Sequence, residues 1–289
     1  MNMRNRLLLA VCVVVACTRV LSLDDFLFDP TTIDEYLRPE DFDPEWETRF
    51  IIHDSLIEPV TLVSMGNTIY GFFVRGNPDS ALHNQVSILY FHGKDENINR
   101  YWARIEYLWE MGFNVFIFDY QGYGKSEGSP SGEALFSDGA EALHYLRSRT
   151  DIDESRIVLY GWSIGTFVTT YCAADVMHPA AVILESAPAS ITALLRDSAL
   201  LNLTGSYVAD ADFDNEKRVG DIACPLLMMH GRADDFIVFD RHVPLVWDAA
   251  HEPKDSLWVE GAGHDDIPFV LGTAYHQAVI DFITAHVLQ

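Results

Sequence analysis

Residues 156–165 read Arg-Ile-Val-Leu-Tyr-Gly-Trp-Ser-Ile-Gly, and this stretch decides the fold. The apolar run at 156–160 is typical of a buried strand, and residues 164–176 have the pattern of a helix. Between them lies a G-x-S-x-G pattern centred on Ser163. At a strand-to-helix junction this spacing predicts a strained turn that presents the serine hydroxyl at the carboxyl end of the strand. Ser163 is therefore a candidate nucleophile, with a purely structural serine as the alternative.

The chain on both sides of this turn alternates apolar runs with helical periodicity. Residues 61–64 and 68–74 predict a hairpin. Further strands are expected at 86–91, 114–118, 180–184, 225–229 and 257–259, and further helices at 100–111, 133–149 and 274–288. Apolar strands that alternate with helices predict an α/β fold, in which a mostly parallel sheet is covered by helices on both faces.

One segment, residues 190–214, interrupts this alternation. It is too short for a further domain, and its leucines include Leu194, Leu195, Leu200 and Leu201. We expect a small cap, which forms either an apolar lid over the site or an amphipathic helix that completes the core.

A serine nucleophile needs a base and an orienting acid, and in folds with this turn they follow the serine in the order acid, then histidine. His264 lies in the glycine-rich stretch 261–264, directly after the last expected strand. Asp234 follows the strand at 225–229 and is the expected acid. Asp235 and Glu185 are the alternatives, because each also lies near the carboxyl end of an expected strand.

Acyl transfer also needs two backbone N–H groups that stabilise an oxyanion. Ile164 directly follows the candidate nucleophile at the start of a helix, where N–H groups have no partner within the helix. The second donor is expected in the loop after the strand at 86–91, and the N–H of Lys94 is the favoured group.

These motifs together resemble the α/β-hydrolase superfamily, in its small-capped esterase and serine aminopeptidase S33-like branch. The resemblance covers residues 60–289 and includes six segments in the order found in the family: 91–93, 118–128, 161–165, 184–188, 224–234 and 261–264. The family's nucleophile, acid and base fall on Ser163, Asp234 and His264. The charged run Lys94-Asp95-Glu96 departs from the small neutral residues common in the family.

The resemblance implies an eight-stranded type of sheet and a serine hydrolase that works through an acyl-enzyme. A carboxylesterase acting on a small-molecule ester or acyl substrate is the first expectation. A peptidase, thioesterase, amidase or acyltransferase has the same triad, and a binding protein that keeps the fold is the non-enzymatic alternative. No metal or other cofactor is expected, because no cluster of His, Cys, Asp and Glu has ligand spacing.

The amino terminus reads as a targeting signal. Arg4 and Arg6 precede an apolar run of about ten residues that is too short to span a bilayer, and Ala16 precedes Cys17. Residues 1–22 therefore predict export to a bacterial cell envelope, with cleavage before Cys17 and lipid attachment to that cysteine. An ordinary secretory signal, cut near Ala16 or Ser22, and an uncleaved anchor are the alternatives.

The sequence is strongly acidic, and residues 23–59 form a distinct acidic segment before the predicted domain. The sequence has 43 acidic and 19 basic residues, a net charge of −24, which excludes a nucleic-acid partner and disfavours anionic substrates. Residues 23–59 form an acidic extension whose interleaved aromatic side chains predict that it docks on the domain at 60–289. Nothing in the sequence indicates an oligomeric state.

Overall fold

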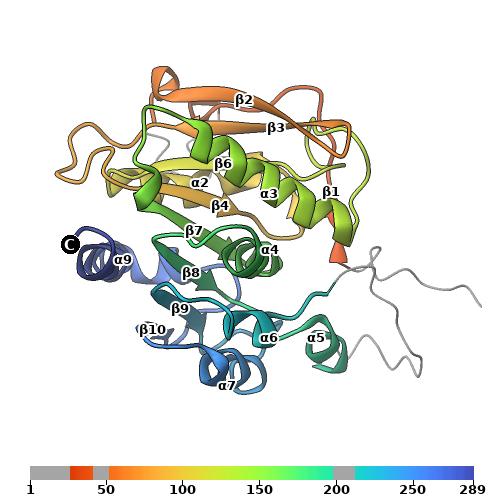
Figure 1. Cartoon of the computed structure of the whole chain (residues 1–289), viewed down its shortest axis with the longest axis vertical. Helices are drawn as coiled ribbons and strands as arrows, with labels where there is room; N and C mark the ends of the chain where they lie inside the picture. The colour runs from red at the N-terminus through yellow and green to blue at the C-terminus, as the bar shows by residue number, and fades with distance from the viewer. Residues whose placement is uncertain (1–26, 42–51, 198–211) are drawn as a thin grey trace, which may run out of the picture.

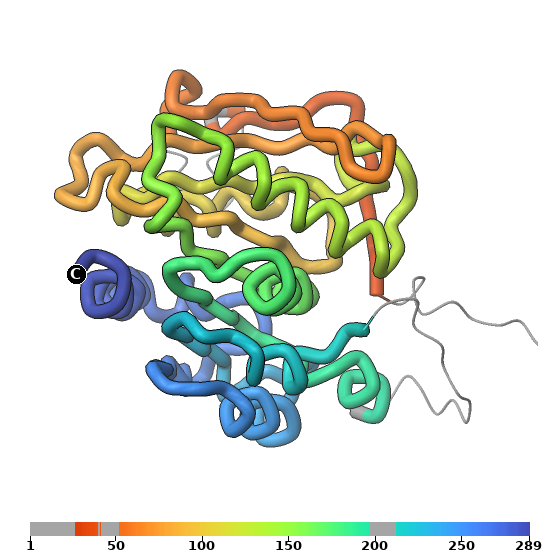
Figure 2. The backbone as a smooth tube through the Cα atoms, in the orientation of Figure 1, coloured from red at the N-terminus to blue at the C-terminus, as the bar shows by residue number. Residues whose placement is uncertain are grey.

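The computed structural model describes residues 27–41, 52–197 and 212–289. An eight-stranded sheet crosses it in the order β10-β9-β8-β7-β4-β6-β3-β2 (Figure 1). The pairs β2–β3 and β3–β6 are antiparallel, and the other neighbours are parallel. The strands are β2 (Ile57–Ser64), β3 (Asn67–Val74), β4 (Ser87–Phe91), β6 (Asn114–Phe118), β7 (Ile157–Trp162), β8 (Ala181–Glu185), β9 (Leu226–Gly231) and β10 (Lys254–Val259). In Figure 2 the colour changes from orange near the edge formed by β2 to blue near the edge formed by β10; β4 and β6 are the strands out of chain order.

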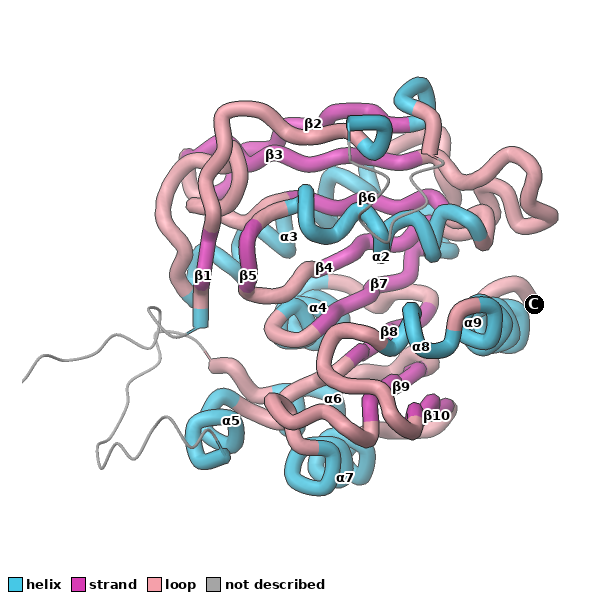
Figure 3. Tube along the Cα trace, turned by 180° about the vertical axis from the view of Figure 1, so that it is seen from behind, coloured by secondary structure: helices cyan, strands magenta, loops and turns pink. Residues whose placement is uncertain are grey.

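Helices cover both faces of this sheet (Figures 1 and 3). One face carries α3 (Gly132–Ser148), α4 (Gly165–Tyr171), α6 (Asn215–Val219) and α7 (Phe239–Ala249). The other carries α2 (Ile98–Glu110), α8 (Ile267–Leu271) and α9 (Thr273–His286). Each face has its own cluster of buried side chains, so both faces of the central strands are apolar, as the continuous apolar runs predicted.

The expected α/β-hydrolase fold is thereby confirmed, with local differences. The helix expected at 164–176 divides into α4 and a π-helical turn, Cys172–Val176, where Met177 N–H donates to the Cys172 carbonyl. Helix α7 was not expected from the sequence, because Pro244 lies inside it and weakens the helical pattern. The short helices α6 and α8 were also not expected.

Residues 27–41 belong to the acidic extension and pack against the domain. Leu27 and Phe28 are buried, and β1 (Asp29–Pro30) pairs in parallel with β5 (Asp95–Glu96). The expected signal at 1–22, with Cys17, lies outside the described residues. Of the expected cap at 190–214, the structure describes α5 (Ile191–Asp197) and residues 190 and 212–214. Among the helices in the described part of the chain, none is both long and apolar enough to cross a membrane.

The register of the parallel strands places the candidate site. Trp162 at the end of β7 lies opposite Glu185 at the end of β8, and Val259 at the end of β10 lies opposite Gly231 at the end of β9. The loops that follow these strands therefore emerge at one edge of the sheet, which brings residues separated by about a hundred positions into contact.

Candidate active site

Ser163 occupies a strained turn between β7 and α4. Its φ of 56° lies in the left-handed region, and its N–H donates to the Glu185 carbonyl at 3.0 Å. The flanking glycines are required by close contacts. A Cβ on Gly161 would lie 2.2 Å from Thr169 Oγ1, and one on Gly165 would lie 2.1 Å from the Phe91 carbonyl oxygen. The G-x-S-x-G pattern thus has the geometry that the sequence predicted for it.

The structure brings the three predicted residues into one hydrogen-bonded chain. Ser163 Oγ lies 3.0 Å from His264 Nε2, and His264 Nδ1 lies 2.9 Å from Asp234 Oδ2. An ionised carboxylate can only accept a hydrogen bond, so Nδ1 carries the proton and Nε2 accepts the serine hydroxyl. Ser163 is 3% exposed and the His264 side chain 18%, so the reactive atoms lie just beneath the surface. This arrangement allows His264 to remove the proton of Ser163.

Asp234 is held as a carboxylate by several donors. Burial raises its pKa, but hydrogen bonds from His230, His264 and the Ile237 N–H outweigh burial and hold the pKa well below its ordinary value. Its Oδ1 accepts the N–H groups of Phe236 and Ile237 at 2.9 and 2.7 Å. Sequence reasoning missed the role of His230, which is fully buried with Nε2 3.3 Å from Asp234 Oδ2. The spacing of four residues between the two was the available signal.

The two alternative acids lie elsewhere. Asp235 is exposed to solvent. Glu185 is fully buried and accepts hydrogen bonds from Arg104 Nη1, at 2.9 Å, and from the Tyr160 hydroxyl. We assign this buried carboxylate and its guanidinium partner a structural role, because removing either one would leave an unpaired buried charge.

The loop that carries His264 is held from several sides. The His264 carbonyl accepts hydrogen bonds from Trp162 Nε1 at 3.2 Å and from Ser186 Oγ at 2.9 Å. Arg104 donates to the carbonyl of Asp265, and its guanidinium lies 4.3 Å from the centre of the Trp162 ring. Ser186, which sequence reasoning did not single out, has a φ of 50° directly after β8. These contacts hold the backbone of the loop, while the bond from Nδ1 to Asp234 orients the imidazole.

The predicted oxyanion donors, Lys94 and Ile164, follow the neighbouring strands β4 and β7. Ile164 is the residue before the first turn of α4, and Lys94 follows β4 by three positions. Within the described part of the chain, neither N–H has a protein acceptor. The ammonium of Lys94 lies 3.7 Å from the Asp95 carboxylate, near the surface. The role of these two N–H groups as oxyanion donors stays a prediction.

His92 sets the direction of the Lys94 N–H. Its Nδ1 donates to the Gly93 carbonyl at 2.7 Å, and that carbonyl shares a planar, trans peptide unit with the Lys94 N–H. Gly93 is also required, because a Cβ there would lie 2.5 Å from the Trp162 ring. The sequence singled out His92 and Gly93 as part of a motif without giving His92 this role.

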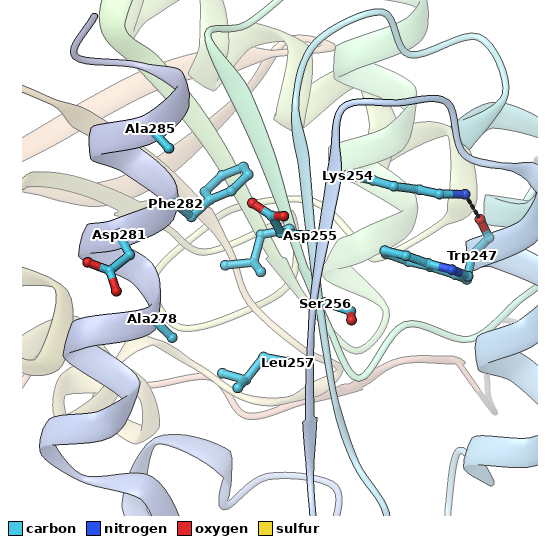
Figure 4. A pocket seen from close by; sticks show the side chains of 10 residues that line it. Trp247, Lys254, Asp255, Ser256, Leu257, Ala278, Asp281, Phe282 and Ala285 are labelled. Atoms are coloured by element: carbon cyan, nitrogen blue, oxygen red, sulfur yellow. Dashed lines mark hydrogen bonds between the residues drawn. The ribbon is translucent and has the colours of Figure 1, made fainter.

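A cavity of about 510 Å³ lies at the far edge of the sheet, between β10, α7 and α9 (Figure 4). Its lining includes none of the three triad residues. Lys254 Nζ points away from its centre, donating to the Trp247 carbonyl at 2.7 Å and lying 4.6 Å from the centre of the Trp247 ring. In the ranges 27–41, 52–197 and 212–289, no three His, Cys, Asp or Glu side chains are grouped as a metal site.

Comparison with known proteins finds related sequences. The family described as "Serine aminopeptidase, S33" matches residues 83–213. The YfhR protein of Escherichia coli is 32% identical over 223 residues, which cover 75% of this chain and 77% of YfhR. Human α/β hydrolase domain-containing protein 17B is 33% identical over 224 residues, which cover 77% of this chain and 74% of that protein.

Solved structures share the fold at low sequence identity. An esterase from Pyrococcus furiosus aligns with a TM-score of 0.69 at 16% identity, covering 90% of this chain and 98% of the esterase. An acylaminoacyl peptidase from Pyrococcus horikoshii aligns with a TM-score of 0.61 at 15% identity, covering 80% of this chain and 42% of the peptidase. The fold and the sequence identity to two curated relatives agree: the chain belongs to the α/β-hydrolase superfamily and is a hydrolase.

Proposed function

We propose that this hydrolase cleaves carboxylic esters through an acyl-enzyme on Ser163. The observation that carries the proposal is the continuous chain of hydrogen bonds from Ser163 through His264 to Asp234, with Ser163 in the left-handed turn. The fold and the S33 match support hydrolysis, and the esterase among the structural neighbours makes an ester the first substrate class to test.

The geometry supports a two-stage reaction. Ser163 Oγ attacks the ester carbonyl while His264 Nε2 accepts the hydroxyl proton, and the carbonyl oxygen becomes an oxyanion. The N–H groups of Lys94 and Ile164 stabilise that charge. The intermediate collapses, the alcohol leaves with the proton from His264, and the acyl group stays on Ser163. Water then attacks the acyl-enzyme, His264 again transfers the proton, and the acid and free Ser163 are released.

A peptidase is the second candidate, because the matched family is described as a serine aminopeptidase. It would use the same three residues on an amide. Parallel assays with p-nitrophenyl esters and aminoacyl p-nitroanilides distinguish an esterase from a peptidase. We expect the esters to be turned over at least tenfold faster than the anilides.

The decisive test is a fluorophosphonate probe together with ester turnover. We expect covalent labelling of the wild-type chain at Ser163, and loss of both labelling and turnover in Ser163→Ala. Ser148→Ala, at an exposed position of α3, is the matched control and keeps both. Failure of the wild-type protein to label or turn over any ester would overturn the enzymatic proposal, and undiminished turnover by Ser163→Ala would overturn the site.

We also propose that residues 1–22 direct export and that Cys17 becomes a lipid-modified amino terminus. The support is the basic, apolar and small-residue pattern at 4–17. Mass spectrometry of the mature protein from a bacterial host tests this. A diacylglyceryl mass on Cys17 supports the proposal, and an unmodified amino terminus contradicts it.

A further inference from the structure

The acidic extension contacts the loop that carries Lys94. Strand β1 lies beside β5, which contains the two residues after Lys94 (Figure 3). The Asp29 N–H donates to the Lys94 carbonyl at 3.1 Å, and the Thr31 N–H donates to the Glu96 carbonyl at 3.2 Å. Glu96 has a φ of 59°, a conformation that residues with a Cβ rarely adopt, so the loop needs external contacts to keep its shape.

Tyr36 connects the same segment to the interior. Its hydroxyl donates to Asp119 Oδ2 at 2.6 Å and accepts the Lys125 N–H at 3.1 Å. Its ring packs edge-on against Phe72 at 5.2 Å between ring centres. Asp119 is fully buried, and its Oδ1 accepts the N–H of Ile98 at 3.0 Å. Tyr36 is thus the side chain of the extension that reaches a buried carboxyl group of the domain.

Asp119 in turn lies against His92. The distance from Asp119 Oδ1 to His92 Nε2 is 3.4 Å, and both side chains are fully buried. The His92 ring is packed between Tyr101 and Tyr120, with ring centres 4.9 and 4.3 Å away. Burial lowers the pKa of His92 to about 3 and raises the pKa of Asp119 to about 8, so His92 is a neutral imidazole that donates through Nδ1.

These contacts form a continuous path from the extension to the candidate oxyanion donor. Tyr36 positions Asp119, Asp119 limits the position of His92, and the His92 Nδ1–H fixes the Gly93 carbonyl. The Gly93 carbonyl and the Lys94 N–H lie in one rigid trans peptide plane and point in opposite directions. Fixing the direction of the carbonyl therefore fixes the direction of the N–H. Asp29 and the Tyr123 hydroxyl hold the following plane by the Lys94 carbonyl, at 3.1 and 2.8 Å.

We propose that residues 27–38 are part of the catalytic unit, and that Tyr36 is a positioning residue which aims the Lys94 N–H at the oxyanion. This inference rests on the proposed serine hydrolase function and assigns a role to the acidic extension. Tyr36 touches no reacting atom. Its effect passes through Asp119 and His92 to the backbone of the Lys94 loop.

Tyr36→Phe tests this, because it removes the hydroxyl and keeps the ring that packs on Phe72. We expect kcat for a p-nitrophenyl ester to fall about tenfold while KM changes less than about twofold, since an oxyanion donor acts on the transition state. Labelling by the fluorophosphonate should slow in parallel. Tyr145→Phe is the matched control, because it removes the hydroxyl of a tyrosine on α3 that accepts a hydrogen bond from Arg149, the residue after that helix, away from the site.

Titration of active sites separates positioning from folding. A tenfold lower turnover per titrated site in Tyr36→Phe supports the proposal. Fewer titrated sites with unchanged turnover per site would show a merely structural role and overturn it, as would a kcat within twofold of wild type. Asp119→Asn gives a second measure. The losses of kcat in Asp119→Asn and Tyr36→Phe should not add in the double variant, because both substitutions alter the hydrogen bond between Tyr36 and Asp119. Additive effects contradict the path. An inactive wild-type protein would instead overturn the proposed function itself.

Discussion

The loops on the two sides of Ser163 are held in different ways. The loop at 261–266, which carries the base, is fixed by Trp162 at the end of β7, Ser186 after β8 and Arg104 on α2. All three lie in the hydrolase domain, on a strand, directly after a strand or on a helix that covers the sheet. The loop at 92–96, which carries the candidate oxyanion donor, is fixed in addition by β1 and Tyr36, which precede the sheet in the chain.

This difference divides the site by chemical task. In the mechanism we propose, proton transfer depends on groups built into the hydrolase domain, whereas stabilisation of the oxyanion depends partly on an extension that packs against it. Changes on the base side should abolish chemistry or change its pH dependence. Changes on the oxyanion side should lower kcat and leave the pH dependence in place.

The largest effect is expected on the base side, from Asp234→Asn. An amide cannot hold His264 in the tautomer that accepts the Ser163 proton, so kcat should fall about 10⁴-fold. Steady-state turnover of a p-nitrophenyl ester measures the loss. Asp235→Asn is the matched control at the exposed neighbouring position and should stay within about twofold of wild type. Equal losses in the two variants would contradict the assignment of the acid.

On the oxyanion side, Gly93→Ala should have the next largest effect. The added Cβ would lie 2.5 Å from the Trp162 ring, so the loop must shift and carry the Lys94 N–H with it. We expect kcat to fall about 100-fold, comparable to losing one oxyanion donor. Gly220→Ala is the control, because a Cβ there meets its nearest atoms at 3.5 and 3.6 Å. A Gly93→Ala variant with wild-type kcat would show that this loop takes no part in catalysis.

The same division explains what the sequence could predict. Ser163 directly follows β7, and Asp234 and His264 lie in the loops that follow β9 and β10. The carboxyl ends of parallel strands meet at one edge of a sheet, so pattern and order sufficed to bring the three residues together. The strands themselves were predictable because continuous apolar runs are needed when both faces are covered.

The supporting contacts could not be predicted, because they join positions far apart with no local pattern. Tyr36 bonds a residue 83 positions away, and Ser186 bonds the backbone of a residue 78 positions away. Every residue has a backbone carbonyl, so the amino-acid sequence does not show that the His264 carbonyl accepts these hydrogen bonds. Helix α7 was missed for a local reason, since Pro244 is normally a helix-breaking residue.

Acid pH tests the base side without a mutation. His264 must be neutral to accept the Ser163 proton, because a protonated imidazole has no nitrogen lone pair left to accept it. The Asp234 pKa is held well below its ordinary value, so this carboxylate stays ionised as the pH falls into the mildly acidic range. We therefore expect kcat/KM to fall along a single acid limb, approaching tenfold per pH unit. Gly93→Ala should keep this limb unmoved, and a flat wild-type profile would contradict the role of His264.

The smallest effect is expected from Ser186→Ala, which removes one of two side-chain donors to the His264 carbonyl. Trp162 Nε1 remains at 3.2 Å, so the loop keeps part of its support and kcat should fall only about threefold, as for one neutral hydrogen bond. Steady-state kinetics measure the loss of kcat. Ser148→Ala is the control, because the Ser148 hydroxyl that it removes donates to a helix carbonyl away from the site. A loss of about tenfold, like that expected of Tyr36→Phe, would mean that the base side depends on one contact as much as the oxyanion side depends on Tyr36. An unchanged rate would mean that Trp162 alone holds the loop, since Ser186 then contributes nothing that the indole does not.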